Sequence, residues 1–150
     1  MKSDDSVSAD AQGMVEAFHR MFDILVHRAP TVVDDQTRAL RERLIQEEFD
    51  ELKEAMAKND LPAIAKEMAD LLYVVYGTAV SYGIDMEPVF REVHRSNMSK
   101  VGGYKREDGK WVKPETYSPA AIAPILTEQS LPTERIVEPL DEAREVQAEA

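Results

Sequence analysis

Four carboxylates with a repeated spacing are the residues of this sequence best suited to chemistry. Glu48 and Glu51 are three positions apart, and Glu67 and Asp70 repeat that spacing further along the chain. Residues three apart share one face of an α-helix. On a helical projection both glutamates of the first pair fall within about 40° of Leu44, inside the apolar stripe. A carboxylate is costly to bury unless it is paired with a cation or binds a metal. These inward positions therefore indicate a functional site.

The donor atoms of these four acids favour a hard divalent metal. The neighbouring basic side chains fall on the outer arcs of the helices: Arg43, Lys53, Lys58 and Lys66. The chain has no cysteine, and its three histidines form no H-E-x-x-H pattern. Oxygen ligands alone favour Mg²⁺ or Mn²⁺ over zinc. The structural alternative is that the acids pair with Lys or Arg, or lie at the open end of a helical bundle.

A basic segment follows the acids along the chain. Residues 91–113 hold seven Lys or Arg and three Asp or Glu, a local net charge of +4 in a chain whose net charge is −11. Asn97 falls on the apolar stripe of the same region. A phosphate-containing substrate needs metals on some of its oxygens and Lys or Arg on others, and this segment supplies the second group. The alternative is a flexible charged connector.

Apolar residues at helical spacing predict four helices that position these side chains. The helices cover residues 10–27, 35–58 and 62–82, and a stretch that begins after Asp85, a helix N-cap residue. Asp108-Gly109 predicts a short hairpin between residues 105–106 and 110–112. Five of the eight prolines lie at or beyond Pro114, which predicts an irregular tail over residues 121–150. The expected fold is all-α, with a four-helix body, a short hairpin and an irregular C-terminal tail.

The third predicted helix, residues 62–82, is apolar on nearly all sides, which is typical of a helix buried all round. This pattern indicates a bundle assembled from more than one chain, with a central helix in a monomer as the alternative. The predicted tail is apolar enough to pack on the body or on a neighbouring subunit.

Length and composition exclude several classes of protein. A chain of 150 residues suits one domain, and the strongly acidic balance argues against stable nucleic-acid binding. The longest uncharged run, residues 71–84, has 14 residues, whereas a membrane span needs roughly 18–20. The first thirteen residues hold no apolar run of the kind found in a signal peptide. We therefore expect a cytoplasmic location and no membrane segment.

The acid pairs resemble the motif of the all-α nucleoside triphosphate pyrophosphohydrolases. Glu47-Glu48-Phe49-Asp50-Glu51 followed by Glu67-Met68-Ala69-Asp70 fits the E-E-x-x-E and E-x-x-D pattern of that superfamily. The superfamily includes MazG-like proteins, dimeric dUTPases, dCTP pyrophosphatases and phosphoribosyl-ATP pyrophosphohydrolases. The stretches DLLYVVYGTAVSYGID and VHRSNMSKVGGYKREDGKWVKPETYSP resemble one MazG-like subgroup. The resemblance covers residues 12–120, so we predict a MazG-like domain over residues 1–120 and a separate tail over 121–150.

This resemblance implies roles for particular residues. Glu48, Glu51, Glu67 and Asp70 match the Mg²⁺ ligands of the superfamily, which hold two or three ions per site. Glu47 matches an extra glutamate that holds a further ion or helps to activate water. The residues expected near substrate are Phe18, His19 and Phe22 at the nucleoside, and Asn97, Lys100, Tyr104, Arg106 and Lys113 at the sugar or phosphates. Lys100 and Arg106 are also expected to offset charge during the reaction.

The implied activity is Mg²⁺-dependent hydrolysis of a nucleoside triphosphate to a monophosphate and pyrophosphate. The resemblance favours dUTP, followed by other non-standard or pyrimidine deoxynucleotides, as substrates of a house-cleaning enzyme. Phosphoribosyl-ATP hydrolysis is the alternative reaction on the same acids. The superfamily forms dimers or tetramers, so we expect a homo-oligomer, with the dimer favoured. A non-catalytic helical interaction protein is the alternative from another class.

Overall fold

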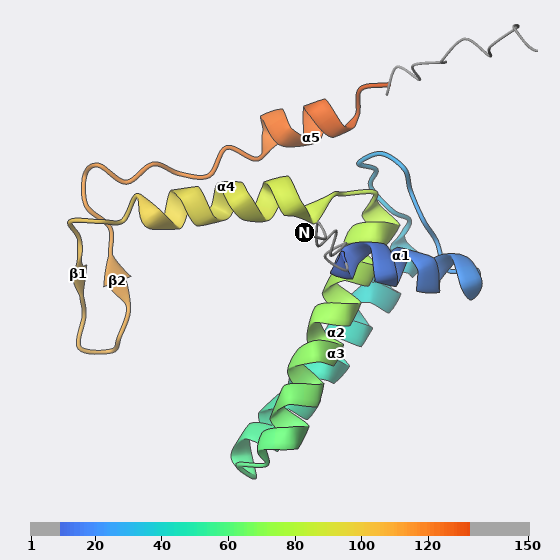
Figure 1. Ribbon diagram of the computed structural model, residues 1–150, viewed down its shortest axis with the longest axis horizontal. Helices are drawn as coiled ribbons and strands as arrows, with labels where there is room; N and C mark the ends of the chain where they lie inside the picture. Colours follow the sequence, from blue (N-terminus) through green and yellow to red (C-terminus); the bar gives the residue numbers. More distant parts are fainter. Residues whose placement is uncertain (1–9, 133–150) are drawn as a thin grey trace, which may run out of the picture.

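The computed structural model of this chain describes residues 10–132, which form five helices and one two-stranded hairpin (Figure 1). The four longest of these helices are the ones that the apolar pattern predicted. The elements, in chain order, are α1 (Ala11–Met21), α2 (Asp35–Ala57), α3 (Leu61–Tyr82), α4 (Met86–Met98), β1 (Tyr104–Lys105), β2 (Trp111–Val112) and α5 (Ala123–Gln129).

The centre of the molecule is a long pair formed by α2 and α3, which run side by side from one end to the other (Figure 1). A tight connection joins them, in which Asn59 takes a positive φ of 52°. Helix α1 packs against α3 near the end where α3 finishes. Most of the buried apolar residues gather at that junction, so the core lies at one end of the helix pair: Val15, Val33, Ala79 and Val80.

Short polar residues set the helix boundaries. Asp10, Asp34, Asp60 and Asp85 each accept a hydrogen bond from a backbone N–H of the first turn, which satisfies a donor that the helix itself leaves free. Gly83 ends α3 with a left-handed φ of 70°. A Cβ at this position would also collide with the carbonyl oxygen of Ala29, so glycine is required on two grounds.

The first helix is shorter than predicted, because it ends at Met21 rather than at residue 27. Asp23 takes a positive φ of 55°, and the N–H of Ile24 donates to the carbonyl oxygen of His19 at 2.8 Å, which closes the helix. The following residues run along the end of α3. There the N–H of His27 donates to Val80 O (3.2 Å), and the N–H of Thr31 donates to Tyr82 O (2.8 Å). The loop therefore supplies N–H donors to carbonyl groups in the last turn of α3, where a helix does not pair all of its own carbonyls.

The hairpin lies where the Asp-Gly signal predicted it. Tyr104 pairs with Val112 and Lys105 with Trp111 in an antiparallel register. Gly109 takes a φ of 86° in the turn. The hairpin extends from the end of α4, which itself points away from the α2–α3 pair (Figure 1). The described part of one chain therefore does not close a four-helix bundle.

The prediction of an irregular tail is wrong for residues 123–129, which form α5. Pro124 lies in the first turn of α5, where a helix has no need of its N–H. Gln129 holds this helix beside α4, because its side chain bonds the N–H and the carbonyl oxygen of Asp85, both at 3.0 Å. The rest of the predicted tail, residues 133–150, lies outside the described residues.

Helix α3 is covered only in part within the described chain. Its buried residues, Gly77, Ala79, Val80 and Ser81, belong to its last turns, whereas the side chains of Leu72 and Met68 are 58% and 48% exposed. The predicted burial on every side is therefore not met by residues 10–132 alone. None of the helices within residues 10–132 combines the length and the hydrophobicity that a membrane span requires.

Candidate functional site

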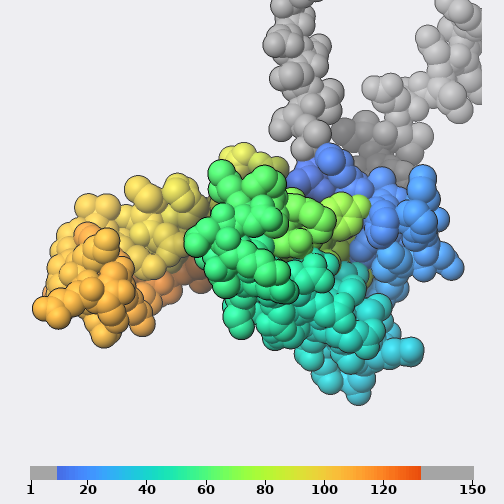
Figure 2. All heavy atoms as spheres, turned by 90° about the horizontal axis from the view of Figure 1, so that it is seen from below, coloured from blue at the N-terminus to red at the C-terminus, as the bar shows by residue number. Residues whose placement is uncertain are grey.

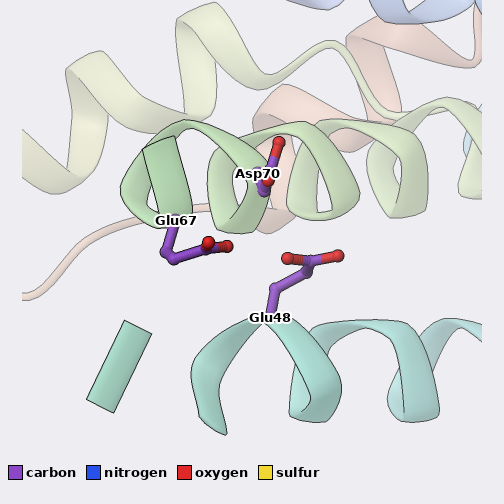
Figure 3. Close-up of side chains that lie close together, drawn as sticks. All are labelled: Glu48, Glu67 and Asp70. Atoms are coloured by element: carbon purple, nitrogen blue, oxygen red, sulfur yellow. The ribbon is translucent and has the colours of Figure 1, made fainter. Parts of the chain in front are cut away.

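Three carboxylates from two helices converge between α2 and α3. Glu48 projects from α2 toward Glu67 and Asp70 on α3 (Figure 3). One oxygen from each of the three lies within 4.8 Å of the others, which is close enough to share a metal ion. The three-residue spacing on α3 and the packing of α2 against it produce this acidic cluster, defined here as Glu48, Glu67 and Asp70.

The negative charge of the acidic cluster is compensated only in part. Oε2 of Glu48 and Oε2 of Glu67 are buried and have no hydrogen-bond partner among the described residues. Burial raises the pKa of Glu48, and the charges of Asp70, Glu51 and Glu67 raise it further. Buried carboxylate oxygens are normally hydrogen-bonded, paired or metal-bound. The donor set is all oxygen, so it fits Mg²⁺ or another hard divalent ion.

Lys66 corrects one expectation about this cluster. The helical projection placed it on an outer arc, yet its Nζ lies 2.7 Å from Oδ2 of Asp70 and 3.2 Å from Oε1 of Glu67. A long lysine side chain reaches a residue four positions along its own helix without leaving the solvent side. The Lys66 side chain is 66% exposed, so this pairing offsets only part of the charge, and it leaves Glu48 Oε2 without a hydrogen-bond partner.

The two other predicted metal ligands lie beside the acidic cluster. Glu51, one turn further along α2, lines an open pocket of about 310 Å³, with Glu67 on the opposite helix. Glu47 points outward with a side chain that is 56% exposed, 3.9 Å from Arg43. The structure therefore brings three of the five predicted acids together, with Glu51 adjacent to them and Glu47 on the rim.

The residues predicted to line a nucleoside pocket divide between two sides of α1. The rings of Phe18 and Phe22 lie 4.5 Å apart, and Tyr73 of α3 meets Phe18 edge-on at 5.6 Å. All three rings are partly exposed. His19 is only 2% exposed and points inward, with its Nδ1 3.1 Å from the carbonyl oxygen of Leu25. Consecutive helical residues are about 100° apart, so His19 cannot join the exposed rings.

Tyr73 was missed in the sequence, although its position three residues after Asp70 places it near the acidic face of α3. We call the exposed rings of Phe18, Phe22 and Tyr73 the aromatic patch.

The basic segment is built at the end of α4. Nζ of Lys100 donates to Oδ1 of Asn97 at 2.6 Å, and the indole N–H of Trp111 donates to the carbonyl oxygen of Lys100 at 2.8 Å. Nζ of Lys113 lies 4.3 Å from the ring centre of Tyr117. A hydrogen bond from Ser96 lowers the pKa of the Tyr117 hydroxyl, with smaller effects from Lys113 and Lys100.

Tyr117 was not expected at this site, because only the fold returns the chain to α4. Two other residues predicted near the substrate do not contact Lys100 or Tyr117 in this way. Tyr104 is 64% exposed, and Arg106 pairs with Asp108 at 3.0 Å.

The acidic cluster and the basic segment lie in different parts of one chain. Figures 1 and 2 show the hairpin at the far end of α4, away from the α2–α3 pair. The expectation that the basic segment stands next to the acids is therefore not met within a single chain. The reason is the direction of α4, which leaves the end of α3 instead of folding back along it.

Comparison with known proteins relates the helical body to one family. Residues 15–97 match the family described as phosphoribosyl-ATP pyrophosphohydrolase, and this range contains the acidic cluster. A stretch of 52 residues, 35% of the chain, is 44% identical to an uncharacterised protein of Acanthamoeba polyphaga mimivirus. The matched stretch amounts to 21% of that protein, so the chain spans about a fifth of the length of the curated relative it matches.

Proposed function

The chain belongs to the phosphoribosyl-ATP pyrophosphohydrolase family, within the MazG-like all-α superfamily, and we propose that it cleaves a nucleotide between its α and β phosphates. Membership of this family indicates a pyrophosphohydrolase, a hydrolase that acts on acid anhydrides. In the proposed reaction water adds to the α phosphorus, and the products are a nucleoside monophosphate and pyrophosphate. The observation that carries the proposal is the acidic cluster, with two buried oxygens that lack a partner.

We assign Mg²⁺, with Mn²⁺ as the alternative, to Glu48, Glu67 and Asp70. The family is typically metal-dependent, and the three carboxylates supply oxygens close enough to bind one ion. When bound, such an ion neutralises phosphate oxygens and lowers the pKa of a coordinated water. We assign Glu51 and Glu47 to one or two further ions, and Glu47 also to the activation of water.

Other residues of the chain are assigned to the substrate by their chemistry. The ammonium groups of Lys100 and Lys113 suit phosphate oxygens, and Asn97 orients the first of them. The aromatic patch offers partly exposed rings on which a nucleobase can stack. Tyr104 and Arg106 remain candidates at the edge of the basic segment.

We propose that the active form is a homo-oligomer, with the dimer favoured over the tetramer. Two observations support this proposal. The acidic cluster and the basic segment lie apart within one chain. Large apolar side chains also stand exposed on α3 and α4, among them Leu72 (58%) and Phe90 (71%). In an oligomer the basic segment of one chain would complete the acidic cluster of another.

Two substrates, dUTP and phosphoribosyl-ATP, are supported equally well. The MazG-like sequence features favour dUTP, whereas the matched family carries the name of the second reaction. Both substrates present a triphosphate, so the acidic cluster serves either.

A substrate panel tests the proposal. The protein is incubated with dUTP, dCTP, other deoxynucleotides and phosphoribosyl-ATP, with Mg²⁺ and Mn²⁺ in separate series, and pyrophosphate release is measured. Glu48→Gln should abolish release, while Glu42→Gln, an exposed position on the same helix, should not. If folded wild-type protein releases pyrophosphate from none of them, the enzymatic proposal fails and a non-catalytic interaction protein takes its place.

A further inference from the structure

Arg41 is a buried cation without an anionic partner in the described part of the chain. Its side chain projects from α2, and the residue is only 5% exposed. No carboxylate among residues 10–132 forms an ion pair with it, and its Nε is fully buried without a hydrogen-bond partner. Burial lowers the pKa of the guanidinium, which still remains charged at neutral pH. Buried arginines are rarely left unpaired, because an uncompensated charge costs several kcal/mol.

His19 and Gly77 complete the surroundings of this guanidinium. If Gly77 carried a Cβ, that atom would lie 2.9 Å from Nε2 of His19 and 3.0 Å from Nη2 of Arg41. The two nitrogens are therefore within about 6 Å of each other. Because Nδ1 of His19 lies 3.1 Å from a carbonyl oxygen, it carries the proton, and Nε2 of the neutral ring is an acceptor. A neutral imidazole does not cancel the charge of Arg41.

Arg41 and Gly77 lie on the same helix faces as the acidic cluster. Arg41 is seven residues before Glu48 on α2, and Gly77 is seven residues after Asp70 on α3. Seven residues are close to two turns, so each step returns to the same face after about 10 Å. Because the two helices run in opposite directions, both steps lead the same way along the interface. The guanidinium thus lies about two turns from the carboxylates, toward the end of the pair where α1 packs.

We propose that Arg41 is an oxyanion site that receives the phosphates released as pyrophosphate. The inference rests on the proposed function, because it takes the acidic cluster as the place where the α phosphate is held. A guanidinium binds phosphate oxygens through two parallel hydrogen bonds, which makes it the side chain most suited to this ligand. Arg41 and Glu48 project from the same face of α2, so a polyphosphate held at the acidic cluster can extend along the interface toward the guanidinium. Gly77 leaves the space that the side chains of Arg41 and His19 occupy.

The test compares pyrophosphate with the monophosphate product as inhibitors of hydrolysis. Arg41→Gln should raise the inhibition constant of pyrophosphate ten- to a hundredfold, as expected for the loss of hydrogen bonds to a charged group. The inhibition constant of the monophosphate should change less than twofold, because it carries no β or γ phosphate. Arg38→Gln is the matched control, an exposed arginine of the same helix, and should change neither constant.

A second variant separates a ligand site from a structural role. Arg41→Met keeps the bulk of the side chain and removes the unpaired charge, so its melting temperature should equal or exceed that of wild type. A lower melting temperature together with unchanged pyrophosphate inhibition would overturn the proposal and assign Arg41 to packing or to a carboxylate of another chain. Equal weakening of both inhibitors would also overturn it.

Failure of the proposed function remains distinguishable from failure of this inference. If wild-type protein hydrolyses no nucleotide, the shift in melting temperature caused by pyrophosphate with Mg²⁺ replaces the inhibition constants. Under the proposal this shift is present in wild type and in Arg38→Gln and lost in Arg41→Gln. An equal shift in all three proteins, or no shift in wild type, would refute the oxyanion site.

Discussion

Replacing Glu48 by Gln should stabilise the metal-free protein while it removes the metal response. An oxygen of Glu48 lies within 4.8 Å of an oxygen of Glu67 and of Asp70. At that distance two unit charges repel by about 0.9 kcal/mol in water and by about 3.5 kcal/mol at an effective dielectric constant near 20. Glutamine keeps the shape of the side chain and removes both repulsions, and Lys66 continues to offset charge at the other two acids.

We expect the free energy of unfolding of metal-free Glu48→Gln to exceed that of wild type by about 1–2 kcal/mol at pH 7. This value takes the low end of the Coulomb range, because the site is partly open and Lys66 already compensates some of the charge. For a chain of 150 residues, the difference corresponds to a rise in melting temperature of about 2–8 °C.

Divalent metal should reverse the order of stability. An ion at a hundred times its dissociation constant stabilises the folded state by about 2.7 kcal/mol, which exceeds the gain from removing the charge. Thermal unfolding is therefore followed for wild type and Glu48→Gln, each in EDTA and across a Mg²⁺ and a Mn²⁺ titration. Wild type should be the less stable protein in EDTA and the more stable one at saturating metal.

Glu42→Gln is the control, because Glu42 lies on the same helix with its side chain 72% exposed. Its melting temperature should follow wild type in both conditions. A metal-free Glu48→Gln that is less stable than wild type, with an unchanged metal response, would refute the reasoning. Glu48 would then be a structural acid, and the acidic cluster would not bind the ion.

Three further predictions concern the core and the assembly. Burial lowers the pKa of His19 below its usual 6.5, so the unfolded state binds more protons below that pH, and stability is lost as pH falls from 6.5 toward the folded pKa. His19→Gln should therefore show a smaller drop in melting temperature between pH 7.5 and 5 than wild type; an equal drop would contradict this assignment. Gly77→Ala should cost about 1–3 kcal/mol in urea unfolding, because its Cβ would overlap His19 and Arg41, and a neutral result would mean that the site is looser than described. Finally, Lys100→Ala and Glu48→Gln should each be inactive alone, yet regain activity when mixed and reassembled, if sites form across chains; no recovery in mixed oligomers would argue for sites within one chain.

Local signals in the sequence determined most of the helical body. The ends of α3 and the start of α4 follow from Pro62, Gly83 and Asp85, whose backbone preferences act within a turn. The hairpin follows from Asp108-Gly109 for the same reason. The inward position of Glu48 was also predicted correctly, because the side-chain period of a helix depends only on the helix itself.

Interactions between distant segments were decided by the tertiary structure alone. The first helix ends early because its continuation bonds the end of α3, about fifty residues away along the chain. Gln129 forms hydrogen bonds to Asp85 that hold α5 against α4, which no local pattern in the proline-rich segment indicated. The reach of Lys66 to Asp70 depends on a flexible side chain whose direction a helical projection does not contain.

The sequence by itself thus determined which acids lie on inward helix faces, and the fold decided how these acids are arranged and which charges around them lack a partner. Helical periodicity placed Glu48, Glu67 and Asp70 on inward faces, but only the packing of α2 on α3 brings their oxygens within 4.8 Å. Only that packing also buries Arg41 without a partner beside His19. The physical reason is that periodicity is a property of one helix, whereas burial and charge compensation depend on every element that packs against it.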